Sequence, residues 1–209
     1  MSVQKQSDSR EVILETACRL FAEKGYEKTT IRDLCKEAET YQVSINYYFG
    51  SKENLFKEAC LQAFNFTDEA RLPDKIKRLN VEEQLKAVIR SLLEMVYSDE
   101  KKGWFFKILS RDEDILLKKS INTVLREKQE FHFSLFQSIL RELFEDKISE
   151  SNIRYAYFVL ISHIFTLNHN FARFKEHFFS GEKPDKKELE SLTAKIYRLI
   201  IAGIKDLNK

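Results

Sequence analysis

The sequence predicts an all-α protein, with an N-terminal three-helix helix-turn-helix head, a C-terminal helical bundle and about nine helices in all. Apolar residues recur at steps of three and four along most of the chain, which is the spacing of a buried helix face. Only two prolines and five glycines interrupt the 209 residues, and 43% of the residues are apolar, enough to fill a sizeable core. We expect the head to span residues 1–50 and the body residues 51–209.

The first helix is expected from about Ser9 to Lys24. Ile13, Ala17 and Leu20 fall on one face of it at helical spacing. Gly25 follows directly and can adopt the left-handed conformation that ends a helix. The first helix therefore has an apolar face and a defined end.

Two short helices joined by a tight turn are predicted between Thr29 and Lys52. Thr30 is expected to cap the first of them, whose inward face carries Leu34. Thr40 is expected to cap the second, which runs from Tyr41 to Tyr48. This arrangement is typical of an element that reads DNA with its second helix in the major groove. An ordinary helical hairpin is the alternative interpretation of the stretch.

The outward face of the second helix of this pair suits contacts to base edges. At 100° per residue, Val43 and Tyr47 point most nearly away from the core. Ser44 and Asn46 flank them, and Gln42 lies on the shoulder of the first turn. A glutamine can pair with adenine through two hydrogen bonds, and a valine methyl group can meet the methyl group of thymine.

Polar residues on and around this helix suit contacts to the phosphate backbone, namely Thr30, Asn46, Tyr47 and Lys52. Ser51 is expected to cap the next helix, so Lys52 adds a positive charge to a helix N-terminus that already favours phosphate. Arg32, on the preceding helix, is expected to reach the edge of the groove. The predicted DNA-binding residues are Thr30, Arg32, Tyr41, Gln42, Val43, Ser44, Asn46, Tyr47, Tyr48 and Lys52.

Two motifs in this region, FAEKGYEKTTIRDLCKEA and NYYFGSKENLF, have the order and spacing of a known family. From Ser9 to about Ala63 the chain resembles the N-terminal domain of the tetracycline-repressor (TetR) family of bacterial transcriptional regulators. The resemblance implies a regulator, expected to be a repressor, that binds a palindromic DNA operator as a homodimer and responds to a small molecule. The run from Asn46 to Lys52 is most similar to a subgroup with Asn-Tyr-His-Phe-Gly-Ser-Lys, some of whose members respond to lipid-like or other apolar effectors.

The turn of the motif departs from the family pattern. The family usually has Gly-Val-Ser there, whereas this chain has Glu39, Thr40 and Tyr41. A non-glycine residue is therefore expected at a backbone position that often has positive φ. The strain costs about 1 kcal/mol, which is too little to unfold the motif.

The body is predicted to contain one helix after another. The first expected helix runs from Ser51 to about Leu72, and the second begins after an N-cap at Asn80. A short third helix follows a break at Gly103, and a long fourth helix begins at about Ile115. The last two run from Ser149 or Ser151 to Phe179, and from an N-cap at Asp185 that pairs with Glu188.

The final helix is apolar nearly all round in its second half, so we expect it to be buried on several sides. Gly203 would let the backbone of a partner approach closely. The resemblance implies that the last two helices form a four-helix dimer interface, and burial within one chain is the alternative. The predicted interface residues are Phe165, Leu192, Ile196, Leu199, Ile200 and Gly203.

Aromatic residues concentrate in the body, with few neutral polar groups among them. This composition fits a concave site for a small apolar effector, lipid-like or aromatic, and it fits a packed core equally well. The family resemblance favours a cavity. The predicted lining residues are Trp104, Phe105, Ile108, Phe131, Tyr155, Phe158, Ser162, Phe165 and His169.

The sequence supports no catalytic, cofactor or metal site. His163 and His169 stand six residues apart, so on one helix they project about 120° from each other and cannot share a metal ion. No Gly-rich phosphate loop, nucleophile elbow or paired carboxylate motif occurs. We therefore expect a protein that is not an enzyme. A helical protein-interaction module without DNA binding is one alternative, and an enzyme without a recognisable motif is another.

The charge of the head is nearly balanced, because residues 1–60 carry nine Lys and Arg against ten Asp and Glu. DNA binding must then depend on where single charges lie. The most apolar segment, Tyr155 to Leu167, is too short to span a bilayer, and no signal-peptide pattern opens the chain. A cytoplasmic protein with no membrane partner is expected. The three cysteines lack metal or redox spacing and are expected to be structural.

Overall fold

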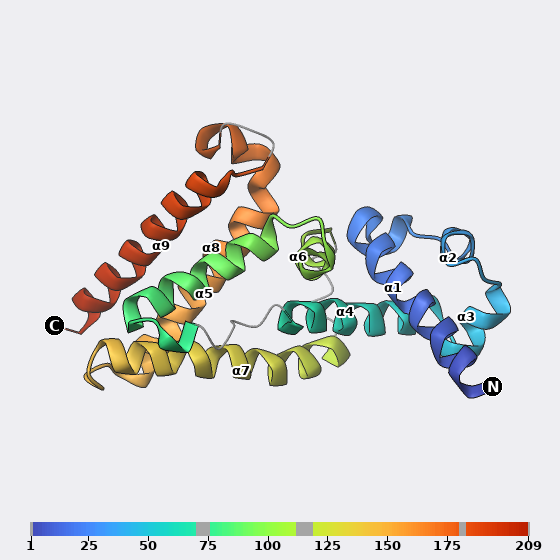
Figure 1. The fold of residues 1–209 in the computed structure, drawn as a ribbon, viewed down its shortest axis with the longest axis horizontal. Coiled ribbons are helices and arrows are strands. Elements are labelled where there is room, and N and C mark those ends of the chain that lie inside the picture. Colours follow the sequence, from blue (N-terminus) through green and yellow to red (C-terminus); the bar gives the residue numbers. More distant parts are fainter. Residues whose placement is uncertain (1, 70–75, 112–118, 180–182, 209) are drawn as a thin grey trace. The chain divides into compact units, whose positions relative to one another are not determined.

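The computed structural model describes residues 2–69, 76–111, 119–179 and 183–208. Within these ranges the chain forms nine α-helices and one short 3₁₀ helix and no strand, so the predicted all-α fold is confirmed (Figure 1). None of the helices described is long and apolar enough to cross a bilayer. The elements are α1 (Ser2–Lys28), α2 (Ile31–Glu37), α3 (Gln42–Phe49), α4 (Lys52–Glu69), η1 (Ile76–Arg78), α5 (Val81–Val96), α6 (Lys101–Arg111), α7 (Lys119–Leu143), α8 (Glu150–Phe178) and α9 (Lys186–Leu207).

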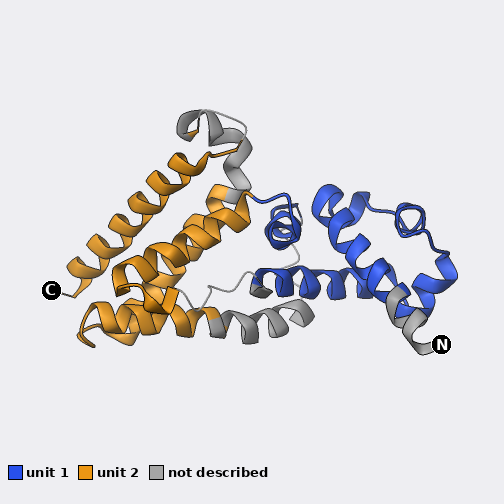
Figure 2. Ribbon diagram, viewed as in Figure 1, with its two compact units in different colours: residues 1–69, 98–125 blue, residues 70–97, 126–209 orange. Residues whose placement is uncertain are grey.

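The chain divides into two compact units (Figure 2). Unit 1 comprises residues 1–69 and 98–125, and unit 2 comprises residues 70–97 and 126–209. The division does not fall after residue 50, because α4 packs along α1 and α6 packs on both. The functional assignment of residues 1–50 to DNA binding and of residues 51–209 to ligand binding and dimerisation stays a prediction.

The core of unit 1 is built from aromatic rings. Phe21 of α1 and Phe56 of α4 meet edge to face, with centroids 4.8 Å apart, and both are almost fully buried. Phe105 of α6 packs edge to face on Phe64 of α4, also at 4.8 Å. Such ring pairs contribute about 0.5–1.5 kcal/mol beyond the apolar area that they bury. Helix α6 is therefore part of the core that supports the head.

Polar contacts fix α6 to α1 near both of its ends. Lys101 Nζ lies 2.6 Å from a carboxylate oxygen of Glu15, and Arg111 Nε donates to the carbonyl of Ala22 at 2.8 Å. Gly103 is buried inside α6, so the predicted helix break at this residue is wrong. The helix starts two residues earlier, because a glycine near a helix start costs only about 1 kcal/mol and the aromatic residues that follow it are buried.

Unit 2 is a helical bundle in which α9 packs against α5 and α8. The inner face of α5 carries Leu85, Ile89 and Leu93, all fully buried. The predicted capping residues are confirmed for three helices. Asn80 accepts from the Glu83 N–H, Ser149 from the Asn152 N–H, and Asp185 forms a reciprocal pair with Glu188. The predicted helix start near residue 115 lies outside the described residues.

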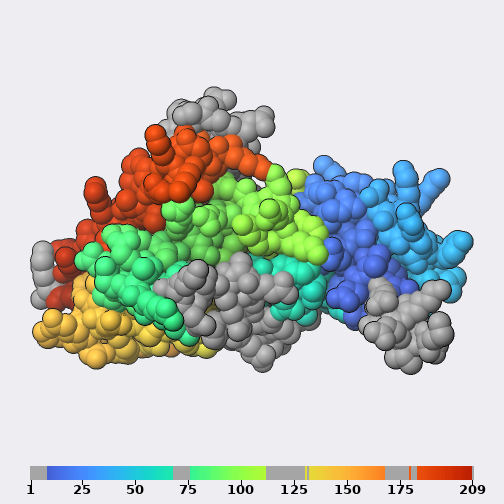
Figure 3. Space-filling model, viewed as in Figure 1, coloured from blue at the N-terminus to red at the C-terminus, as the bar shows by residue number. Residues whose placement is uncertain are grey.

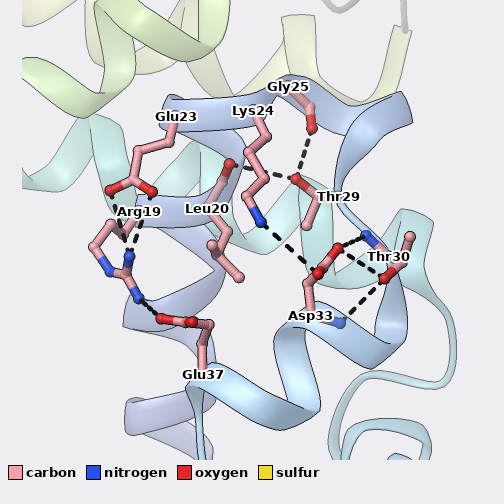
Figure 4. Close-up of polar contacts among 9 residues, drawn as sticks. All are labelled: Arg19, Leu20, Glu23, Lys24, Gly25, Thr29, Thr30, Asp33 and Glu37. Atoms are coloured by element: carbon pink, nitrogen blue, oxygen red, sulfur yellow. Dashed lines mark hydrogen bonds and ion pairs between the residues drawn. The ribbon is translucent and has the colours of Figure 1, made fainter.

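The joint between α1 and α2 depends on Gly25 and Thr29. Gly25 has φ 79° and ψ 171°, a conformation that is essentially restricted to glycine, and it kinks the end of α1. Thr29 is fully buried, and its Oγ1 donates to the Gly25 carbonyl at 2.7 Å and lies 3.3 Å from the Leu20 carbonyl (Figure 4). These contacts satisfy the buried hydroxyl and fix where α2 begins.

The turn between α2 and α3 contains the positive φ expected from the sequence, at Glu39, where φ is 48°. The Thr40 N–H donates back to the Cys35 carbonyl at 2.9 Å. Tyr41 then takes the extended conformation of an N-cap, without a side-chain hydrogen bond, and α3 begins at Gln42. The prediction of Thr40 as the N-cap is wrong, because its N–H closes the turn and the extended residue comes one position later.

Substitutions at Gly25 and Glu39 should change the stability of the protein in opposite directions. Gly25→Ala forces a residue with a Cβ atom into φ and ψ values that are essentially restricted to glycine. It should lower the free energy of unfolding by about 1–3 kcal/mol. Glu39→Gly relieves left-handed strain and should raise it by up to about 1 kcal/mol. Urea unfolding of both variants measures the two changes.

The matched control is Glu39→Ala, which removes the same side chain but keeps the Cβ atom. Its unfolding free energy should stay within about 0.5 kcal/mol of wild type. A Gly25→Ala variant as stable as wild type would contradict the strain assigned to this joint.

Candidate DNA-binding site

Helix α2 begins with a capping box, as the sequence predicts for Thr30. The backbone N–H of Thr30 donates to Asp33 Oδ2 at 3.0 Å, and the Asp33 N–H donates to Thr30 Oγ1 at 3.1 Å (Figure 4). The hydrogen bonds from Thr30, first of all the one from its backbone, lower the pKa of the Asp33 carboxyl. The Thr30 hydroxyl also donates to Asp33 at 2.8 Å, so the group predicted to meet a phosphate is engaged in the cap.

Exposed ion pairs orient α2 on α1. Arg19 lies 2.8 Å from Glu37 of α2 and 3.4 Å from Glu23 of its own helix (Figure 4). Lys24 lies 3.8 Å from Asp33. The hydrogen bond with Arg19 lowers the pKa of Glu37. Because these groups are open to solvent, the pairs add little to stability and mainly set the orientation of α2.

Helix α3 has a buried and an exposed face, divided as the sequence predicts. Ile45 is fully buried and Phe49 is 4% exposed. Tyr41, Val43 and Tyr47 are 81%, 77% and 74% exposed, which is unusual for large apolar side chains. In Figure 3, side chains of the light-blue segment that holds α2 and α3 project from the surface of unit 1.

The other predicted DNA-binding residues of α2 and α3 surround this face. Gln42, Asn46 and Arg32 are exposed. Ser44 and Tyr48 are half-buried, and the Tyr48 ring packs edge to face on the Tyr47 ring at 5.1 Å. Helix α3 carries no charged side chain, so any cation at this surface comes from a neighbouring element.

Lys52 stands at the first position of α4. The Ser51 hydroxyl accepts from the Asn54 N–H at 3.1 Å, which confirms Ser51 as the cap of this helix. Lys52 Nζ lies 4.2 Å from the centroid of the Tyr26 ring. The ammonium group is therefore held on an aromatic face beside a helix N-terminus.

Arg10 makes a contact at this site that the sequence did not predict. Arg10 of α1 stacks its guanidinium group 5.0 Å from the Phe49 ring of α3 and pairs with Glu58 of α4. It thereby joins three helices of unit 1. No spacing pattern predicts the contact, because the partners lie far from Arg10 in the sequence.

The residues predicted to line an effector site are divided between the two units. Trp104, Phe105 and Ile108 are buried in unit 1. Tyr155 and Phe158 of α8 are 55% and 65% exposed, and their assignment to a concave effector site stays a prediction. Helical spacing alone does not distinguish an inward from an outward aromatic face. Ser162 and Phe165 are half-buried, and the side chains of Phe131 and His169 lie outside the described residues.

The residues predicted for a dimer interface are also divided. Leu192, Ile196 and Ile200 are at most 8% exposed, because they pack into the core of unit 2 within one chain, and their assignment to a dimer interface stays a prediction. Leu199 is 61% exposed, and Gly203 is exposed too. A Cβ atom added at Gly203 would meet nothing within 4 Å.

An open hollow of about 370 Å³ lies on α1 beside α6. Its lining is mostly polar or charged, so it does not match the apolar site expected for the effector. The lining residues are Glu11, Val12, Glu15, Thr16, Arg19 and Trp104.

Two of the three cysteines occupy core positions, and the third, Cys35, is half-buried. Cys18 and Cys60 are buried, and Cys18 Sγ donates to the Ala59 carbonyl at 3.3 Å. Burial raises the pKa of the Cys18 thiol, so this group is protonated and unreactive at neutral pH. Across the described parts of the chain, no group of three or more His, Cys, Asp or Glu side chains is arranged to hold a metal ion.

Residues 13–59 match the family model described as bacterial regulatory proteins, tetR family. The HTH-type transcriptional repressor AcnR from Corynebacterium glutamicum is 30% identical over 150 residues, which are 72% of this chain and 71% of AcnR. The structure of FadR from Bacillus subtilis in complex with stearoyl-CoA matches with a TM-score of 0.64 at 17% identity, over 93% of this chain and 98% of FadR. The structure of AibR in complex with isovaleryl coenzyme A and operator DNA matches with a TM-score of 0.67 at 15% identity, over 90% of this chain and 98% of AibR.

The two structural matches have low sequence identity and show a shared fold. The similarity to AcnR extends over most of both chains, well beyond the helix-turn-helix. The matched segment of the family model contains α2, α3 and the start of α4, where the exposed face described above is found. The chain belongs to the TetR family of bacterial transcriptional regulators.

Proposed function

We propose that this protein is a transcriptional repressor that binds a palindromic operator as a homodimer and releases it when a small apolar effector binds. The main support for DNA binding is the exposed face of α3. Its apolar side chains Tyr41, Val43 and Tyr47 stand in solvent, while Ile45 and Phe49 seat the helix in the core. The repressor function of AcnR supports repression as the output.

The chemistry of α3 suits base reading, and its surroundings suit backbone contacts. Gln42 can bind adenine and the Val43 methyl groups can meet thymine, whereas no arginine or lysine of α3 is available for guanine. Arg32 and Lys52 supply positive charge from the neighbouring helices. The proposed DNA contacts are Thr30, Arg32, Tyr41, Gln42, Val43, Ser44, Asn46, Tyr47, Tyr48 and Lys52, with Thr30 acting mainly through its cap.

A homodimer follows from the small reach of one recognition helix. Dimers of helix-turn-helix proteins read two half-sites about 34–36 Å apart. Large apolar side chains are exposed on both α8 and α9, two helices that pack against each other. Tyr155, Phe158, Leu199 and Gly203 are the residues that we assign to the interface.

An acyl thioester is the effector class that we favour. FadR and AibR, which share this fold, were solved with stearoyl-CoA and isovaleryl coenzyme A. Trp104, Phe105 and Ile108 are buried apolar side chains of unit 1 that could line such a site. An effector that binds only a dimer with wrongly spaced heads lowers operator affinity by its preference for that state.

Lys52→Ala tests DNA binding. If Lys52 neutralises a phosphate, the variant should bind selected and random duplexes more weakly, and the slope of log Kd against log salt should fall by about 1. Gln42→Ala should leave the slope unchanged and relax the preference at one base pair. The measurement is binding to duplexes selected from a random library, over a range of salt concentrations.

The charge-matched control is Lys147→Ala, which removes an exposed lysine of unit 2 and should leave the slope unchanged. Equal slopes for wild type and Lys52→Ala would remove the phosphate assignment. A wild type that binds no duplex at low salt would instead favour an interaction module without DNA binding.

Gly203→Leu tests the dimer. The new side chain meets no atom of its own chain near Cβ, so the fold should persist while two α9 helices are forced apart. Sedimentation should show less dimer, and circular dichroism should show unchanged or higher helix content. Lys205→Leu, about 200° around the helix, is the matched control. An unaltered dimer for Gly203→Leu, or a monomeric wild type at micromolar concentration, would exclude the proposed interface.

Thermal unfolding with a panel of compounds tests the effector class. A ligand at 100 times its Kd should stabilise the protein by about 2.7 kcal/mol. We expect stabilisation by acyl thioesters or acyl chains and a change in Trp104 fluorescence. Stabilisation by polar metabolites alone would contradict an apolar effector.

A further inference from the structure

The ammonium group of Lys52 lies on the face of an aromatic ring. Its Nζ atom lies 4.2 Å from the centroid of Tyr26, and among the described residues no carboxylate forms an ion pair with it. Glu53, the next residue of α4, pairs with Lys57 at 3.0 Å. The Lys52 charge is therefore oriented by an aromatic face and is not neutralised there.

Tyr26 is itself fixed by the core of unit 1. Its ring lies 4.7 Å from the Phe56 ring and 6.1 Å from the Phe21 ring. It follows Gly25 directly, so the kink at the end of α1 delivers the ring to this place. Burial raises the pKa of the Tyr26 phenol, which keeps the ring neutral at physiological pH.

We propose that Tyr26 is a positioning residue for DNA binding, which holds the Lys52 ammonium group at the N-terminus of α4, ready for a backbone phosphate. A lysine side chain has a flexible four-carbon stem, and restricting it before binding lowers the entropy lost on binding. The ring attracts the cation without occupying the site of an anion, so the phosphate and Tyr26 do not compete. This inference rests on the proposed DNA-binding function.

A double-mutant cycle between Tyr26 and Lys52 tests the proposal. Tyr26→Leu should weaken binding to a random-sequence duplex by roughly two- to fivefold at low salt. It should also lower the salt slope part of the way towards that of Lys52→Ala. In the Lys52→Ala background, the same exchange should have no further effect, because the two residues act through one contact. Tyr26→Phe, which keeps the ring, should restore wild-type affinity and slope.

Two controls separate positioning from folding. Thermal unfolding shows that each variant is folded at the temperature of the binding measurement. Tyr197→Leu removes the ring beneath Lys86 in unit 2, a similar cation contact at 5.1 Å, and should leave DNA binding unchanged.

The outcomes distinguish this inference from the proposed function. If Lys52→Ala lowers the slope and folded Tyr26→Leu does not, Lys52 meets a phosphate without help from Tyr26 and the inference is wrong. Equal losses from Tyr26→Leu with and without Lys52 would also overturn it, because the ring would then act through folding alone. If Lys52→Ala leaves the slope unchanged, the phosphate assignment itself fails.

Discussion

The edge-to-face contact between Phe21 and Phe56 is the interaction on which the head depends, because it joins α1 to α4 at the centre of unit 1. Tyr26 packs against both rings, and Lys52 lies on Tyr26. The core contact between α1 and α4 is thus linked through the Tyr26 ring to the Lys52 ammonium group, which we propose binds a DNA phosphate. Helix α6 packs on the same two helices, so a shift of α6 would act on the elements that carry this chain of contacts.

Helix α3 is held by packing and not by its own propensity. It has eight residues, too few for a stable isolated helix, and its N-cap has no side-chain hydrogen bond. Ile45 and Phe49 anchor it, which frees the outward positions from any role in stability. Tyr41, Val43 and Tyr47 can therefore be apolar and exposed at once, a combination that marks an interaction surface.

The last helix, α9, shows that an amphipathic pattern does not reveal which surface covers its apolar face. Leu192, Ile196 and Ile200 follow the spacing expected of an interface, yet they fill the core of their own unit. Leu199 and Gly203 belong to the same pattern and remain exposed. Periodicity reports that a face is buried, and only the packing of α5 and α8 decides which residues the chain itself covers.

The sequence by itself determined the all-α fold, the cap at Thr30 and the family motifs, because helix periodicity, capping and motif spacing are local properties. It left the geometry of the turn from Glu39 to Tyr41 open, and the structure placed the positive φ at Glu39. Only the tertiary structure decided that α6 belongs with the head and that Tyr41 begins α3. The contact between Lys52 and the Tyr26 ring could not be predicted from the sequence either, since the two residues are distant in sequence. Contacts of this kind depend on how the helices pack, and local pattern carries no information about which distant side chains that packing brings together.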